Sequence, residues 1–353
     1  MMTFEDAGGW PTLIGDLLDR THLTREHAQL AMSTVLQGEA TAAQLIGFIV
    51  ALRAKGETAD ELSGMLDAVL GAATVVTLPP ELRDRAIDIV GTGGDRSHSI
   101  NVSTISALVI AGAGVPVCKH GARAASSKCG TGDVLEALGV AVELGPEGVA
   151  RCVEQAGIGF CLAAKYHPAF RFAAPSRREI GVPTAFNLLG PMTNPARVTR
   201  QVIGVANPAY AERMVESLRS HGSIASWVVN GSGLDELSTT GPSDVLELRD
   251  GQVNQFVVDA RDFGIARAEP EQLVGGDPQE NAAAATRVLA GDHGPHRDIV
   301  LLNSAAGLVV SGIVDTLADG LPLAAESLDS GKARAALALL IEHSQAALAT
   351  ERS

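Results

Sequence analysis

Two glycine-rich stretches carry residue types that could bind phosphate. The first reads G-T-G-G-D over residues 91–95 and is followed by N-V-S-T, and the second reads K-H-G-A-R-A-A-S-S-K-C-G-T-G-D over residues 119–133. Glycine lets backbone N–H groups approach a charged group closely, and Ser and Thr add hydroxyl donors. Lys119, Arg123 and Lys128 bring positive charge to the second stretch. Together the two stretches predict an anion-binding site.

Two familiar phosphate-binding fingerprints do not fit the first stretch. The dinucleotide fingerprint would need a glycine at Arg96, and the Walker lysine and hydroxyl do not follow Gly94. A G-T-G-G sequence by itself would equally suit a tight turn between a strand and a helix. The prediction of an anion site therefore depends on both stretches together.

A pair of adjacent carboxylates, Asp235 and Glu236, follows a third glycine-rich segment, G-S-G-L-D-E. Neighbouring carboxylates repel each other unless a cation lies between them, and Mg²⁺ is usually bound through one or two carboxylates together with substrate phosphates. A solvated turn is the structural alternative. Acid/base work of the glycosidase type is a third possibility, but neighbours in sequence rarely flank a bond across several ångströms.

The segments around the glycine stretches indicate how these groups are positioned. Residues 87–90 and 115–118 are apolar runs of strand length, and a helical pattern that begins after Asn101 and ends at Gly112 lies between them. We expect each stretch at the carboxyl end of a parallel strand, with Lys119-His120-Gly121 turning out of the second strand. Such ends are where open α/β sheets bind ligands.

The remainder of the chain predicts a helical domain followed by an α/β domain. Residues 10–73 are helical in pattern, with Thr24, Thr41 and Thr58 as caps, and Leu78-Pro79-Pro80 ends this part. Strands are predicted at 158–163, 201–206 and 224–230, an antiparallel hairpin at 245–248 and 253–258, and helices at 281–290, 299–309 and 324–347. The predicted fold class is α/β, with a mostly parallel central sheet, helices on both sides and a smaller all-helical domain.

Composition excludes several classes of function. The chain of 353 residues has a formal net charge of −14 and only 3% aromatic residues, which argues against nucleic-acid binding. Its four cysteines show no zinc spacing and are typical of a reducing compartment. The acidic first residues do not resemble a signal peptide, and no apolar run reaches the roughly 18 residues of a membrane helix. We expect a cytoplasmic protein without membrane contact.

Three arginines lie in the segment 168–191, and one of them could recognise a carboxylate. On an uninterrupted helix Phe170 and Arg177 would share a face, although Pro175 would kink that helix or begin a second one. A planar guanidinium fork suits a benzoate. For Arg171 and Arg178 a solvated helix face is the favoured interpretation.

Five motifs, in order, resemble those of anthranilate phosphoribosyltransferase, from about residue 12 to residue 312. They read G-T-G-G-D, N-V-S-T, K-H-G-A-R-A-A-S-S, N-L-L-G-P-M-T-N-P and G-L-D-E-L. The resemblance implies transfer of the phosphoribosyl group of 5-phosphoribosyl 1-pyrophosphate (PRPP) to the amine of anthranilate, a Mg²⁺-dependent step of tryptophan biosynthesis. It also implies a nucleoside phosphorylase/phosphoribosyltransferase-type architecture and a homodimer through the helical domain. That domain would be discontinuous, with residues 1–80 and about 168–200, and the α/β domain would comprise 81–167 and about 201–353.

The resemblance carries over residue by residue to three groups of positions. The donor-binding positions are Gly91, Gly93, Gly94, Asp95, Asn101, Val102, Ser103, Thr104, Lys119, His120, Gly121, Ser126 and Ser127. The metal positions are Ser103, Asp235 and Glu236. The acceptor positions are Gly91, His120, Ala122, Phe170 and Arg177. We expect catalysis by charge neutralisation and positioning, with no covalent protein nucleophile.

One departure from the family pattern concerns the acceptor. The family motif is K-H-G-N-R, whereas this chain has Ala122, and Phe170 stands where relatives often carry Tyr. Loss of a neutral hydrogen bond costs about 0.5–1.5 kcal/mol, so a different aromatic acid acceptor is the alternative hypothesis. A nucleoside phosphorylase, whose loop typically reads K-H-S-T-G-G, and a non-catalytic nucleic-acid-binding paralogue are less favoured.

Overall fold

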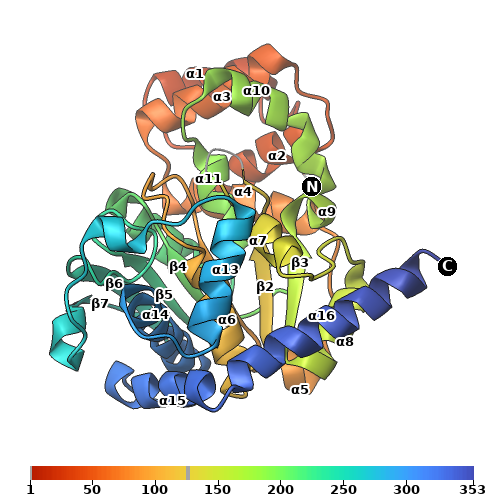
Figure 1. Cartoon of the computed structure of the whole chain (residues 1–353). Helices are drawn as coiled ribbons and strands as arrows, with labels where there is room; N and C mark the ends of the chain where they lie inside the picture. The colour runs from red at the N-terminus through yellow and green to blue at the C-terminus, as the bar shows by residue number, and fades with distance from the viewer. Residues whose placement is uncertain (1, 125–127) are drawn as a thin grey trace.

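The computed structural model describes residues 2–124 and 128–353. An N-terminal bundle of helices lies on one side of an α/β body (Figure 1). The bundle consists of α1 (Gly9–Leu18), α2 (Arg25–Leu36), α3 (Ala42–Lys55) and α4 (Ala59–Ala72). Thr24, Thr41 and Thr58 cap α2, α3 and α4 by accepting hydrogen bonds from backbone N–H groups of the first turn, as predicted.

The body is built on a seven-stranded sheet of order β3-β2-β1-β4-β5-β6-β7. The strands are β1 (Ile87–Gly91), β2 (Val117–Gly121), β3 (Ile158–Leu162), β4 (Arg200–Gly204), β5 (Ala225–Asn230), β6 (Ser243–Arg249) and β7 (Gln252–Val258). The first five are parallel, and β6 and β7 add an antiparallel hairpin at the edge. Asp250 and Gly251 form its turn with φ of 50° and 76°, which suits a type I′ turn. The predicted fold class is confirmed.

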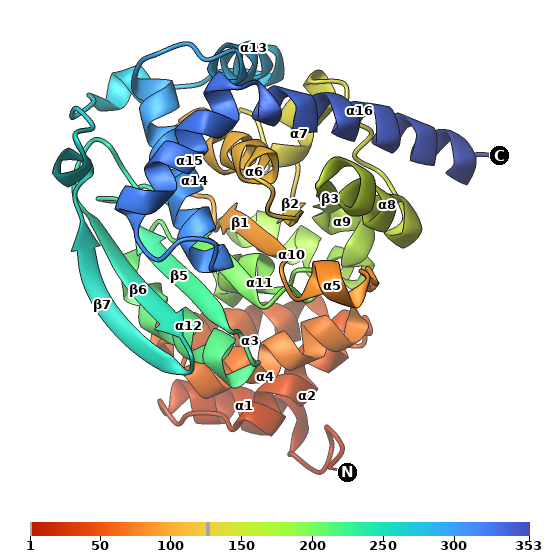
Figure 2. The same cartoon turned by 90° about the horizontal axis from the view of Figure 1, so that it is seen from below.

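Helices cover both faces of the sheet and enclose two separate cores (Figure 2). One face carries α6 (Val102–Gly112), α8 (Pro146–Ala156), α14 (Pro295–Ser311), α15 (Leu317–Asp329) and α16 (Lys332–Glu351). The other face carries α12 (Ala211–Ser220) and α11 (Ala185–Met192), which also packs against α3 and α4. Ile87 and Ile89 point into the first core and Val90 into the second, so β1 is buried on both faces.

The remaining elements are short, apart from one helix. They are α5 (Pro80–Arg83), α7 (Thr131–Ala137), α9 (Ala163–Tyr166), η1 (Pro168–Phe172), α10 (Ala174–Ile180), η2 (Pro208–Tyr210), η3 (Ala260–Phe263), η4 (Pro270–Leu273) and α13 (Pro278–Leu289). Since α10 and α11 contact α3, the later segment lies against the bundle. The contacts favour the predicted discontinuous division of the chain, which stays a prediction. No helix of the described chain is long and apolar enough to span a bilayer.

Two local predictions are wrong. Lys119, His120 and Gly121 do not turn out of the second strand, because β2 continues to Gly121. The helix expected at 324–347 is two helices, α15 and α16, separated at Gly331, whose φ of 79° favours glycine. The alternative that Pro175 begins a second helix is confirmed: Phe170 belongs to η1 and Arg177 to α10, so any proximity between them comes from packing across that break.

Candidate functional site

The predicted donor and metal residues that the structure describes lie at the carboxyl edge of the parallel strands. Gly91 ends β1, and the loop that follows has positive φ at Gly93 (68°) and Gly94 (81°), as well as at Arg96 (61°). Glycine accommodates that conformation without strain. A Cβ at Gly91 would overlap the carboxylate of Asp235, so glycine is required there by a close approach as well.

The acidic pair connects the first glycine stretch to the start of α6. The Oδ2 atom of Asp235 accepts a hydrogen bond of 2.7 Å from the N–H of Gly93. The Oε1 atom of Glu236 accepts one of 3.1 Å from the N–H of Ser103. The two hydrogen bonds therefore join residues that are separated by 142 and 133 positions in the sequence. The predicted metal positions Ser103, Asp235 and Glu236 are brought together.

Burial makes this acidic pair electrostatically unfavourable. It raises the pKa of Asp235 to about 7, with a further contribution from the nearby carboxylate of Asp95. It raises the pKa of Glu236 to about 8, and the charge of Asp235 adds to that effect. Two such groups are stabilised in their charged forms by a bound cation.

The donor set fits Mg²⁺ better than a metal held by protein groups alone. Within the described residues no three His, Cys, Asp or Glu side chains form a metal-binding group. Mg²⁺ retains waters and substrate phosphates as ligands and needs only one or two protein carboxylates. Asp235, Glu236 and the Ser103 hydroxyl match that requirement.

Lys119 extends the site to the neighbouring strand. Its Nζ atom donates hydrogen bonds to the carbonyl oxygen of Ile89 and, at 3.3 Å, to the hydroxyl of Ser103, and the residue is 1% exposed. Burial lowers the pKa of the ammonium, while the charges of Asp88 and Glu236 oppose that shift. Lys119 thus places a buried cation beside the predicted metal position.

Asn101, at the start of α6, is held by the surrounding residues. Its side chain does not cap α6. Instead, its Oδ1 atom accepts hydrogen bonds from the Asn281 amide at 2.8 Å and from the Cys129 thiol at 3.4 Å. The hydroxyl of Thr104 is buried and has no hydrogen-bond partner within the described chain. These groups border the predicted donor site together with Val102.

A row of aromatic rings leads from β2 towards the bundle. The rings of His120 and His167 are 5.1 Å apart, and His167 stacks on Phe170 at 5.5 Å. Phe170 meets Phe186 edge-on at 5.6 Å, and the guanidinium of Arg177 lies 4.8 Å from the centre of the Phe186 ring. Phe186, which the sequence did not identify, therefore joins the predicted acceptor residues Phe170 and Arg177 across the helix break.

The acceptor-side groups have a defined charge state. Burial lowers the pKa of His120 well below its ordinary value and that of His167 to about 4, so both rings are neutral at pH 7. The Nε2 atom of His120 is buried without a hydrogen-bond partner among the described residues. Burial lowers the pKa of Arg177, and no acidic neighbour in the described chain opposes that shift. Its guanidinium is therefore available to a carboxylate.

The second glycine stretch is only partly described. Ser126 and Ser127 lie outside the described residues, and Ala122 is exposed after Gly121. The expected contribution of Arg123 to the anion site is wrong: its guanidinium is paired with Glu136 at 2.7 Å and with Glu143 at 3.2 Å. Lys119 of this stretch reaches the site, where its Nζ atom contacts Ser103.

Two cavities of the molecule do not coincide with this chemistry. One of about 370 Å³ opens between α4, α12 and the start of β4, and one of about 310 Å³ lies beside α12 and β5. None of the predicted site residues that the structure describes lines either cavity. The site is therefore located by its chemistry and not by the size of a cavity. Carboxylates with raised pKa values, a buried lysine and an arginine without an acidic partner among the described residues mark it.

Other residues of the site escaped sequence reasoning. Gly204 of β4 has no space for a Cβ because the backbone of Asp235 lies there, and Asp88 of β1 is fully buried. Asp88 did leave a signal in A-I-D-I-V, since an acidic residue inside an apolar strand is rarely buried unless it is paired. His167 and Phe186 could not be found from a sequence pattern, because only packing brings them to His120 and Arg177.

Family models match both parts of the chain. A glycosyl transferase family helical bundle domain matches residues 11–73, and a glycosyl transferase family a/b domain matches residues 83–334. The chain is 49% identical over 338 residues to anthranilate phosphoribosyltransferase of Salinispora arenicola, covering 94% of this chain and 96% of that protein. It is 52% identical over 302 residues to the same enzyme of Saccharopolyspora erythraea, covering 86% and 85%.

Solved structures give the same result. The crystal structure of anthranilate phosphoribosyltransferase from Thermus thermophilus matches with a TM-score of 0.89 and 40% identity, covering 94% of this chain and 99% of that one. The Saccharomyces cerevisiae enzyme in complex with PRPP and Mg matches with a TM-score of 0.86 and 28% identity, covering 96% and 98%.

Proposed function

The chain belongs to the anthranilate phosphoribosyltransferase family, and we propose that its carboxyl-edge site binds PRPP and Mg²⁺ while the aromatic row on the bundle side binds anthranilate. The observation that carries this proposal is the buried pair Asp235 and Glu236, whose raised pKa values call for a cation. The pair is fixed by the N–H groups of Gly93 and Ser103, from the first glycine stretch and α6.

The protein is an anthranilate phosphoribosyltransferase of tryptophan biosynthesis. The anthranilate nitrogen forms a bond to C1 of the ribose, the bond from C1 to the pyrophosphate oxygen breaks, and the nitrogen loses a proton. The alternative of a different aromatic acid acceptor, suggested by Ala122, is not supported, because the relatives and the structural neighbours bear the same enzyme name. The nucleoside phosphorylase and the nucleic-acid-binding paralogue are likewise not supported.

On the donor side, charge neutralisation is the main contribution of the protein. Ser103, Asp235 and Glu236 would hold Mg²⁺, which when bound neutralises charge on the pyrophosphate leaving group. Lys119 supplies a fixed positive charge next to Ser103. The remaining proposed donor residues are Gly91, Gly93, Gly94, Asp95, Asn101, Val102, Thr104, His120, Gly121, Ser126 and Ser127.

On the acceptor side, Arg177 would bind the anthranilate carboxylate and the neutral rings would contact its benzene ring. Arg177 is partly buried over Phe186 and has no acidic partner to displace among the described residues. Hydrogen bonds to a charged group are worth roughly 1.5–3 kcal/mol, and partial burial strengthens them. Because His120 and His167 are neutral, they do not compete with Arg177 for the carboxylate.

Binding measurements on two variants separate the two halves of the site. Asp235→Asn should abolish Mg²⁺-dependent PRPP binding in titration calorimetry, whereas Arg177→Lys should leave it intact and raise the KM for anthranilate. The purified wild-type protein should release pyrophosphate from PRPP only when anthranilate and Mg²⁺ are both present. Equal PRPP affinity in Asp235→Asn and wild type would refute the metal assignment.

We also infer a homodimer and a cytoplasmic location. Leu18, Val50 and Phe172 are exposed apolar side chains on α1, α3 and η1 of the bundle, with exposed fractions of 70%, 42% and 41%. If they form one contiguous patch, such a patch favours a subunit contact. Light scattering should give the mass of a dimer, and Leu18→Glu with Val50→Glu should give that of a monomer. The Sγ atoms of Cys118 and Cys161, 3.7 Å apart, contact each other as thiols, which suits a reducing compartment.

A further inference from the structure

The pairing between β1 and β2 is unusually short at the place where the two halves of the site meet. Over their described lengths these strands share one register pair, Ile87 with Val117, although β1 pairs with β4 through five positions. Beyond that pair, side chains replace the backbone ladder. Asp88 Oδ1 accepts the N–H of His120 at 3.1 Å, and Lys119 Nζ donates to the carbonyl oxygen of Ile89.

Asp88 is in turn fixed by Asn194, in the loop after α11. The Asn194 amide donates to Asp88 Oδ2 at 2.8 Å and to the carbonyl oxygen of Cys118 at 2.8 Å, while its own oxygen accepts the N–H of Ala196 at 2.9 Å. Both side chains are buried, with exposed fractions of 0% and 2%. Each polar atom of Asn194 thus has a partner, so the amide can adopt only one orientation without losing a hydrogen bond.

Asp88 also contributes to the electrostatics of Lys119. The buried ammonium of Lys119 is stabilised by the charges of Asp88, Glu236 and Asp235. In the proposed function the last two are committed to Mg²⁺. Asp88 is then the remaining carboxylate that offsets the charge of Lys119.

We propose that Asp88 and Asn194 are a positioning pair that holds β2 so that Lys119 faces the donor and His120 faces the acceptor. Successive residues of a strand point to opposite faces, so a single hydrogen bond to the His120 N–H orients both side chains. Lys119 reaches Ser103 on one face, and His120 reaches His167 on the other. This inference rests on the proposed function of the site.

The proposed positioning role predicts a kinetic result that a merely structural buried network would not give. Asp88→Asn keeps an acceptor for His120 but sets an amide nitrogen against the Asn194 amide. We expect the KM for PRPP and the KM for anthranilate both to rise, each by roughly tenfold, which corresponds to one lost buried hydrogen bond. The exchange Asp88→Asn with Asn194→Asp restores a donor and an acceptor between the two positions and should recover part of both losses.

Ser344→Ala is the matched control, because the Ser344 hydroxyl is buried in α16 and accepts the N–H of Ala141 far from the site. It should lower the Tm without changing either KM. If Asp88→Asn fails to fold, Asn194→Ser, which removes only part of the network, replaces it with the same expectation in the same direction.

The proposal is overturned if both KM values of a folded variant stay within twofold of wild type, or if the exchange recovers nothing. A wild-type protein that releases no pyrophosphate would instead overturn the proposed function, so the two failures are distinguishable.

Discussion

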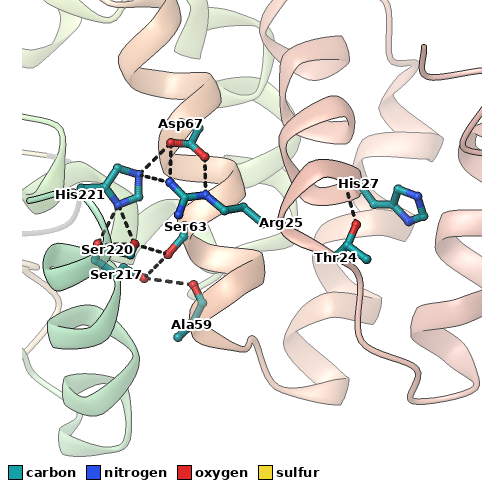
Figure 3. A network of polar contacts seen from close by, with 9 residues as sticks. All are labelled: Thr24, Arg25, His27, Ala59, Ser63, Asp67, Ser217, Ser220 and His221. Carbon is teal, nitrogen blue, oxygen red and sulfur yellow. Dashed lines mark hydrogen bonds and ion pairs between the residues drawn. The ribbon is translucent and has the colours of Figure 1, made fainter. Parts of the chain in front are cut away.

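Two polar networks of this protein use the same kinds of side chain in opposite ways. At the contact between the bundle and α12, Asp67 accepts hydrogen bonds from Arg25 at 2.6 and 2.8 Å and from His221 at 2.9 Å (Figure 3). Ser63 and Ser217, with Ser220 beside His221, continue that network (Figure 3). At the carboxyl edge of the sheet, Asp235 and Glu236 are adjacent, and they accept the backbone N–H groups of Gly93 and Ser103. The carboxylate of Asp95 lies beside Asp235, and the charge of Lys119 acts on Glu236.

The pKa shifts of the acidic residues have opposite directions in the two networks. Burial raises the pKa of Asp67, but hydrogen bonds from Arg25 and His221 outweigh it and the net shift is downward. For Asp235 and Glu236 burial prevails and the pKa values rise to about 7 and about 8. We therefore expect the first network to stabilise the fold and the second to need a ligand and to serve function.

The largest effect should come from Glu236→Gln, which removes the charge and keeps an acceptor for the Ser103 N–H. We expect kcat/KM for PRPP to fall at least roughly 100-fold, the scale of losing one electrostatic element of a catalytic site. The Tm without Mg²⁺ should not fall, because a buried carboxylate is replaced by a neutral group. Pyrophosphate release and calorimetry measure the two quantities. Retention of activity within tenfold would place Glu236 outside the donor site.

Arg177→Lys should have the next largest effect. A lysine keeps the positive charge but loses the planar fork that suits a benzoate and packs over Phe186. The KM for anthranilate should rise roughly 10- to 100-fold, corresponding to about 1.5–3 kcal/mol, with the KM for PRPP unchanged. Arg178→Lys is the control, because Arg178 is exposed on the same helix and should change neither KM. A parallel rise in both KM values would argue against a carboxylate-specific role.

Asp67→Ala should show the converse result. It leaves Arg25 and His221 without their common acceptor, and we expect unfolding to become easier by about 1–3 kcal/mol. Both KM values should stay within twofold of wild type, since none of the predicted site residues that the structure describes lines the cavity that Asp67 and His221 border. Denaturant unfolding and steady-state kinetics test the two parts. A large change in kcat with unchanged stability would remove the distinction between the two networks.

How much of this contrast the sequence predicts depends on the range of the interactions. The fold class, the first glycine stretch and the acidic doublet are predicted because strand periodicity, glycine and adjacent carboxylates are local patterns. The caps at Thr41 and Thr58 are predicted for the same reason. Arg25 and His221, by contrast, are 196 positions apart and leave no local pattern.

The errors have the same origin. Lys119 and His120 read as a turn because polar residues end an apolar run, but Asp88 and Ser103 provide buried partners that let β2 continue through them. Arg123 read as part of an anion site, but Glu136 and Glu143 take its charge. In each case a partner distant in sequence reversed the meaning of a charged residue.

Titration of stability should separate the networks by sign. Asp235 and Glu236 have folded-state pKa values above their unfolded ones, so the stability they contribute is complete below about pH 4 and is lost as the pH rises through about 7 and 8. Without Mg²⁺ the Tm should therefore fall by several degrees between pH 6 and 9. Mg²⁺ with PRPP should abolish that fall. Asp67, whose pKa is lowered, loses its contribution only on acidification below about pH 4. A Tm that is flat above pH 6 without ligand would contradict the raised pKa values.

The smallest effect concerns Ala122, which is exposed at the edge of the site and has neither the burial of the acidic pair nor the partners of Asp67. The family motif has asparagine here, so Ala122→Asn should add one neutral hydrogen bond to anthranilate. Its KM should fall by at most about tenfold, corresponding to about 0.5–1.5 kcal/mol, with the KM for PRPP and the Tm unchanged. Ala124→Asn, two positions further along the same exposed loop, is the control. An unchanged KM would mean that Arg177 and the ring contacts alone determine acceptor affinity. Exposed positions of the site would then contribute as little to binding as the Asp67 network does.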